Sequence, residues 1–210
     1  MTYLQLVNKV LVRLRENEVS TVNENSYSKL IGEYVNEAKN TVETAWDWTG
    51  LRTTLSVDTQ ANVFNYVLTD ADSTIKMLDA TNDSLNSFLG YKSSRWFDQA
   101  FLDFASVPKG TTQFYSINGI NSVDLYPIPD KEYTLRFNLV LRKGDFTLDE
   151  EVLYVPFNPV VRKATALASR ERGETGGTSA AELFALADDS LADAIAMDAA
   201  LHPEETIWYS

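Results

Sequence analysis

Cysteine is absent from the 210-residue sequence, which excludes disulfides, thiolate metal ligands and cysteine nucleophiles. The one histidine, His202, has no second histidine with which to form a zinc site. No apolar run reaches the length of a membrane span, and the first residues lack the basic region, apolar core and cleavage site of a signal peptide. We therefore expect a soluble protein, made in a cytoplasm, that has no metal, cofactor or membrane contact.

Positive charge is scarce as well, since the formal net charge is −12. From Gly173 to Ser210 there is no lysine or arginine, but there are eight acids, namely Glu174, Glu182, Asp188, Asp189, Asp193, Asp198, Glu204 and Glu205. Such a surface repels the phosphate backbone of nucleic acid. It is either a solvated helix face or a surface that stays close to nucleic acid without binding it.

Helical periodicity marks both ends of the chain. The pattern predicts helices over residues 2–15, 26–48, 159–172 and 179–200, with Gly50 and Gly173 as stop signals. Trp46 and Trp48, at the end of the second helix, are expected to anchor the helical part against the middle of the chain. The third long helix carries a basic cluster, which either pairs with acids of the last helix or forms a charged subunit contact: Arg162, Lys163, Arg170 and Arg172.

The middle of the chain alternates with a period of two, which predicts short β-strands. Asn118-Gly119 favours a type I′ hairpin, and residues 93–104 have the pattern of a short helix. Pro127 and Pro129 cannot donate ladder hydrogen bonds, so we expect a strand to end there and the prolines to block pairing at that edge. A longer strand, in which Leu135 and Phe137 share one face, follows.

These elements predict an α+β fold. Residues 1–50 and 156–201 are expected to form a four-helix bundle from two N-terminal and two C-terminal helices. Residues 51–155 would form an inserted antiparallel β region with a short helix near 93–104, and residues 202–210 a flexible C-terminal tail.

No group of residues has the pattern of a catalytic site. The adjacent acids Asp188-Asp189 and Glu204-Glu205 would point in different directions on a helix, whereas acid–base catalysis needs carboxylates that converge. A hydrolase site would need acids such as Asp98, Asp103 and Asp124, which are dispersed over different segments. The sequence therefore favours a protein without catalytic activity, and a hydrolase is the least favoured alternative.

Four stretches, in this order, resemble one family: "AWDWTGLRTTLSV", "DLYPIPDKEYTLRFNLVLR", "VPFNPVVRKATALASRERGE" and an acidic, alanine-rich last helix. The set is similar to the head–tail adaptor proteins of tailed bacteriophages, also called connector or tail tubular protein A-like proteins. The resemblance implies a virion protein that forms a ring of about twelve copies beneath the portal protein. The ring would extend the channel through which double-stranded DNA passes without sequence-specific binding during ejection, and it would support the tail nozzle or tail tube protein. A tail completion or terminator protein, which binds the tube rather than the portal, is the alternative.

The resemblance also implies roles for parts of this sequence. The last residues would dock on the portal, with aromatic anchors that order on binding: His202, Pro203, Glu204, Glu205, Thr206, Ile207, Trp208, Tyr209 and Ser210. The acids that share one face of the last helix would line the channel: Glu182, Asp189 and Asp193. Two β turns would contact the tail or a neighbouring subunit: Asn118, Gly119, Pro127, Pro129, Asp130 and Lys131.

Overall fold

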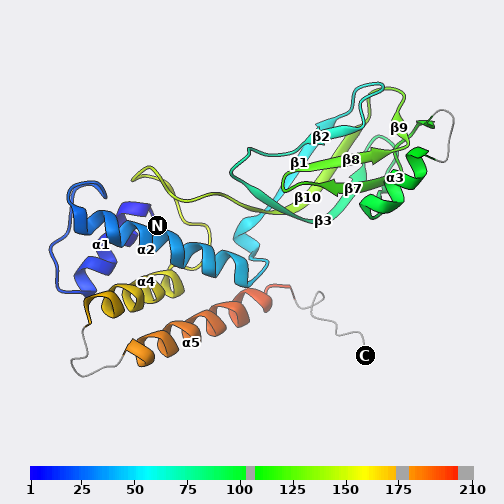
Figure 1. The fold of residues 1–210 in the computed structure, drawn as a ribbon. Helices are drawn as coiled ribbons and strands as arrows, with labels where there is room; N and C mark the ends of the chain where they lie inside the picture. Colours follow the sequence, from blue (N-terminus) through cyan, green and yellow to red (C-terminus); the bar gives the residue numbers. More distant parts are fainter. Residues whose placement is uncertain (103–106, 174–179, 203–210) are drawn as a thin grey trace. The chain divides into compact units, whose positions relative to one another are not determined.

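The computed structural model describes residues 1–102, 107–173 and 180–202 (Figure 1). The chain divides into two compact units, a helical unit of Met1–Gly50 with Asp145–Ser210 and a β unit of Leu51–Gly144. Each unit has its own buried apolar residues, and each is considered by itself below.

The first two helices of the helical unit begin at side-chain caps. Helix α1 spans Tyr3–Arg13, and Thr2 and Gln5 form a capping box at its start. Helix α2 spans Ser26–Ala45, where the side chain of Asn25 accepts hydrogen bonds from the backbone amides of Tyr27 and Ser28. Apolar residues at helical spacing bury one side of each helix, and the two helices pack on each other.

Helices α4 (Phe157–Arg172) and α5 (Ala180–Ala199) complete the helical unit. Gly173, with φ of 66°, ends α4 in the left-handed conformation, which confirms the predicted stop. Helix α4 packs against α1, α2 and α5, and Figure 1 shows α5 (orange) running alongside α4 (yellow). Within the described part of α5, Ala187 is the one fully buried residue. Helix α5 therefore covers α4 on one side without adding much to the core of α1, α2 and α4.

The segment between the β unit and α4 is irregular, with a turn near Asp149, and backbone and side-chain bonds fix it to the helical unit. Its backbone pairs with the N-terminus, where the amide of Tyr3 donates to the carbonyl of Glu151 (2.8 Å) and the amide of Leu153 to that of Met1 (2.9 Å). The amide of the buried Asn36 side chain donates to the carbonyl of Phe146 at 3.1 Å, and its oxygen accepts from the Phe146 amide at 2.9 Å. This segment therefore contributes to the core beside α1 and α2.

Two four-stranded sheets make up most of the β unit. The first has the order β1–β10–β3–β4, and the second β2–β8–β7–β5. Their strands are β1 (Arg52–Asp58), β2 (Asn65–Val67), β3 (Thr74–Asn82), β4 (Ser87–Phe88), β5 (Gly90–Tyr91), β7 (Phe114–Asn118), β8 (Ser122–Tyr126) and β10 (Thr134–Arg142). The sheets share one core, in which Leu135, Phe137 and Leu139 of β10 meet Val123 and Leu125 of β8. The predicted inward face of β10 is thus confirmed.

Helix α3 (Ser94–Leu102) covers the end of the second sheet through aromatic contacts. Phe97 and Trp96 pack on Tyr126, with ring centroids 6.1 and 5.3 Å apart, in edge-on geometry. The short helix predicted for residues 93–104 is therefore present, although Phe104 lies outside the described residues.

The proline stretch differs from the prediction. Ile128–Pro129 forms a short strand, β9, that pairs in parallel with β6 (Lys109–Gly110). Pairing is possible because Ile128, between the prolines, keeps its amide, which donates to the carbonyl of Pro108 at 3.1 Å. The carbonyl of Pro129 also accepts a hydrogen bond, from the amide of Asn62 at 2.8 Å. The expectation that the prolines block pairing was wrong, because a proline loses its donor and keeps its acceptor.

The predicted fold class was correct as α+β but wrong in its architecture. The described residues form five α-helices and ten strands in three sheets, rather than a four-helix bundle with an antiparallel insertion. Helix α5 packs on one side of α4, so the four long helices do not enclose a common core. The pairs β5–β7 and β6–β9 are parallel, and these short pairings have no signal in the alternation of the sequence.

Candidate functional site

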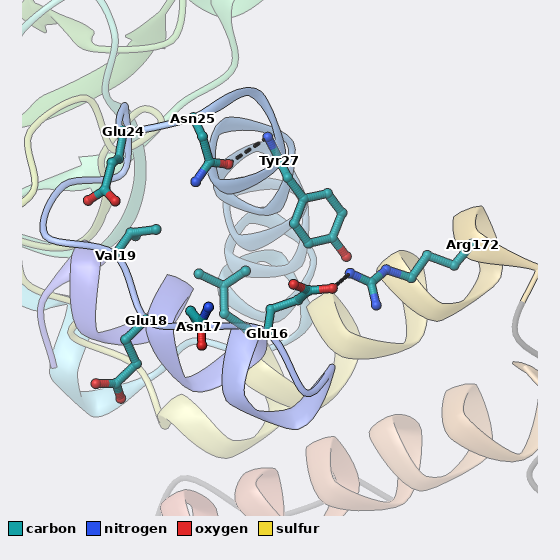
Figure 2. Close-up of a pocket in the computed structure, with 9 residues that line it drawn as sticks. Glu16, Asn17, Glu18, Val19, Glu24, Asn25, Tyr27 and Arg172 are labelled. Atoms are coloured by element: carbon teal, nitrogen blue, oxygen red, sulfur yellow. Dashed lines mark hydrogen bonds and ion pairs between the residues drawn. The ribbon is translucent and has the colours of Figure 1, made fainter.

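A pocket of about 450 Å³ lies in the helical unit, where the loop after α1 meets the start of α2 and the end of α4 (Figure 2). Its lining is mostly polar and includes three carboxylates, Glu16, Glu18 and Glu24, together with Tyr27 and Arg172. Figure 2 shows the Arg172 side chain reaching from α4 towards Glu16 and the Tyr27 ring.

The charged groups of this pocket are mainly engaged with the protein itself. The guanidinium of Arg172 lies 2.6 Å from Oε1 of Glu16 and 4.5 Å from the centre of the Tyr27 ring. Glu24 accepts hydrogen bonds from the amide (2.6 Å) and the hydroxyl (2.7 Å) of Ser20, and these bonds lower the pKa of the Glu24 carboxyl. These contacts therefore hold the α1–α2 connection against the end of α4. Among the residues that line the pocket, no nucleophile lies beside a general base.

The acids considered for a hydrolase site do not converge. Asp124 lies on β8, where its carboxylate accepts hydrogen bonds from the side-chain amides of Asn65 (2.6 Å) and Asn118 (3.0 Å). Asp98 is exposed on α3, and Asp103 lies outside the described residues. Within residues 1–102, 107–173 and 180–202, no group of three or more His, Cys, Asp or Glu side chains has metal-binding geometry. In the same ranges, no helix is long and apolar enough to cross a membrane.

Helix α5 presents the predicted channel-lining acids together. Glu182, Asp189 and Asp193 are all exposed, and their spacing puts them on the side of α5 opposite the buried Ala187. Of the basic cluster on α4, Lys163 lies 3.5 Å from Asp188 on α5, whereas Arg172 pairs with Glu16 instead. An intrachain ion pair between α4 and the acidic helix is thus present.

The end of α5 is attached to the end of α2, which the sequence did not indicate. One carboxylate oxygen of Asp198 accepts from the Trp46 indole and from the backbone amide of Thr49, both at 3.1 Å. The hydroxyl of Thr49 also lies 2.8 Å from Nε2 of His202. His202 is therefore packed against the helical unit, while Pro203 to Ser210 lie outside the described residues.

The two tryptophans at the end of α2 have their hydrogen bonds inside the helical unit. Trp46 bonds to Asp198, and the fully buried Trp48 donates to the carbonyl of Val42 at 2.7 Å. These bonds hold both tryptophans within the helical unit, and their anchoring of the helical part against the β part stays a prediction. The partner of Trp46 is far away in the sequence, and the partner of Trp48 is a backbone carbonyl. The spacing of side chains in the sequence therefore could not predict either hydrogen bond.

The structure separates the two predicted tail-side turns. Asn118 and Gly119, both exposed, lie at one end of β8, and Pro127 follows its other end. The hairpin is confirmed, but it is wider than predicted, because Asn118 pairs with Ser122 and only Gly119 (φ 72°) has a positive φ. At the other turn Asp130 and Lys131 are exposed, whereas Pro127 is half-buried and Pro129 buried.

Comparison with known proteins identifies one family. Residues 1–204 match the model of the SU10 adaptor protein family, whose members are phage head–tail adaptors. No curated protein matches the chain. The match includes the helices and strands of both units and ends just beyond His202.

Proposed function

The chain belongs to the SU10 adaptor protein family of phage head–tail adaptors, and from this premise we propose that it forms a ring beneath the portal of a tailed bacteriophage. The observation that carries the proposal is the extent of the match, residues 1–204, which spans both units. As a phage adaptor the protein is a virion component, and its partners belong to the head and tail. Its role is structural: it joins other proteins without catalysing a reaction.

We assign the parts of the chain as follows. The helical unit forms the wall of the ring, and the outward acids of α5, Glu182, Asp189 and Asp193, face the channel. Their charge repels DNA phosphates, so the genome slides past without binding. The β unit, through the turns at Asn118 and Asp130, contacts the tail nozzle or tube.

The C-terminal residues dock on the portal in this scheme. The packing of His202 against Thr49 gives the docking segment a fixed starting point on the helical unit. From there residues 203–210, which include Trp208 and Tyr209, reach the portal and bury their aromatic side chains.

The test combines the purified protein with the portal protein of the same phage and measures the mass of the complex. We expect a ring of about twelve copies on the portal. Deletion of residues 203–210 should abolish portal binding while the far-UV circular dichroism stays unchanged. A protein that binds the tail tube and ignores the portal would instead be a tail completion protein, and the proposal would be wrong.

A further inference from the structure

A basic patch lies on the outer side of α1 and α4. It consists of Lys9 and Arg13 of α1 and Arg162 of α4. Lys9 lies 4.8 Å from the centre of the Phe157 ring, and the Arg162 guanidinium donates to the carbonyl of Leu186 at 3.3 Å. Partial burial, and then the positive charge of Arg162, lower the pKa of Arg13. Because α1 also packs directly against α4, two guanidinium groups lie near each other in a protein of net charge −12.

None of these three cations has a carboxylate partner among the residues that the structure describes. Val12, next to Arg13, leaves 54% of its surface exposed. The basic patch thus combines uncompensated positive charge with an exposed apolar side chain. An acidic partner surface would pair these positive charges, and an apolar side chain on that surface would remove Val12 from water.

An acidic patch lies on the other side of α4. It consists of the exposed Glu37 of α2 and the exposed Glu171 of α4, together with the half-buried Tyr34 of α2. Glu37 lies one turn beyond Tyr34 on α2, and α2 packs against α4, which carries Glu171. Burial raises the pKa of Tyr34, and the charges of Glu171 and Glu37 raise it further, while the positive charge of Arg170 lowers it. Neither carboxylate has a cation within ion-pair distance in the described ranges.

The two patches face in opposite directions. Arg162 and Glu171 are nine positions apart on α4, which is about 2.5 turns, so their side chains project from opposite sides of the helix. The basic patch continues from α4 onto α1, and the acidic patch continues from α4 onto α2. A second copy of this chain therefore offers each patch its complement, in a head-to-tail arrangement that can close into a ring.

We propose that the basic patch of one copy binds the acidic patch of the next copy, and that this contact joins neighbouring subunits. The inference rests on the proposed ring, and it names the surfaces that build it. Arg13 and Arg162 face Glu37 and Glu171 of the neighbour, and Val12 packs near its Tyr34. The outward acids of α5 belong to neither patch, so the contact does not involve them.

Cysteine trapping tests the geometry, because the chain has no cysteine of its own. Val12→Cys places a thiol in the basic patch, and Tyr34→Cys places one at the position on α2 where Val12 of the neighbour is expected to pack. On the portal, under mild oxidation, the double variant should give a ladder of disulfide-linked multimers that disappears on reduction. Each single variant should stay monomeric. Dimers from a single variant would indicate a two-fold contact and overturn the proposal, as would a double variant without a ladder.

Charge reversal tests the chemistry. Arg13→Glu with Arg162→Glu should reduce the yield of rings on the portal about tenfold, because two attractive pairs become repulsive, and Glu37→Lys with Glu171→Lys should do the same. The variant with all four changes should recover most of the yield, since the charges are exchanged. Asp70→Lys with Asp98→Lys, two exposed acids of the β unit, changes net charge as much as the Glu37→Lys pair and should assemble normally.

Two outcomes separate this inference from the proposed function. If the unchanged protein forms rings on the portal and every charge variant does so equally well, the patches are not the contact, but the adaptor function stands. If the unchanged protein binds no portal and does not self-associate, the proposed function fails and the subunit contact fails with it.

Discussion

The hydrogen bonds between Asn36 and Phe146 give the sharpest stability prediction. Asn36 is 5% exposed, and its side chain makes two bonds to the Phe146 backbone, at 3.1 and 2.9 Å. Asn36→Ala leaves a buried backbone amide and a buried carbonyl without partners, and each such group costs about 1–3 kcal/mol. We expect the free energy of unfolding of the helical unit to fall by about 2–4 kcal/mol.

Urea unfolding followed by tryptophan fluorescence measures this loss, because the fully buried Trp48 reports on the helical unit. With a slope of about 2 kcal/mol per molar urea, the midpoint should fall by about 1–2 M. Asn40→Ala is the matched control, since Asn40 lies one turn further on α2 and donates to the neighbouring Asp145 at 2.7 Å in an exposed position. It should cost less than about 1 kcal/mol. Equal losses for both variants would refute the reasoning that burial makes the Asn36 bonds important.

Three further predictions follow from other contacts. Gly50→Ala should lower the free energy of unfolding by about 1–3 kcal/mol in the same assay, because the added methyl would collide with the carbonyl oxygen of Tyr154. An unchanged free energy of unfolding would show that the backbone at Tyr154 moves aside without cost. Burial, and then the charges of Glu33 and nearby acids, raise the pKa of Tyr3 to about 12. Between about pH 10 and 12 the folded state then holds a proton that the unfolded state has lost, so the free energy of unfolding should fall as the pH rises through this range. In urea titrations at different pH values, Tyr3→Phe should make this fall smaller, and an unchanged fall would contradict the raised pKa of Tyr3. Phe137→Ala should cost about 3–5 kcal/mol in the unfolding of the β unit, measured by amide hydrogen exchange, and a cost under 1 kcal/mol would contradict the shared core of the two sheets.

The periodic elements were the predictable part of the fold. Helix α2 begins at Ser26, as the periodicity predicts, α4 ends at Gly173, and β10 buries Leu135 and Phe137 as its alternation requires. These features depend on local side-chain patterns and caps, which a sequence shows directly. The match to the adaptor family likewise confirms the resemblance inferred from the ordered motifs.

Long-range pairings were not predictable. The strand at Ile128–Pro129 pairs with the backbone of Lys109–Gly110, and no residue type in either segment predicts that pairing. The bond from Trp46 to Asp198 joins residues 152 positions apart. The four-helix bundle was wrong because an alanine-rich helix such as α5 has no strong apolar stripe, so the sequence does not show how much of it is buried.

The central claim is that this chain joins the head to the tail of a phage as a ring beneath the portal. A cryo-electron microscopy map of the intact virion neck tests it most directly. The account predicts a ring of about twelve copies of this fold directly under the portal, with α5 facing the channel. A neck in which this chain is absent, or in which it surrounds the tail tube without touching the portal, would contradict the account.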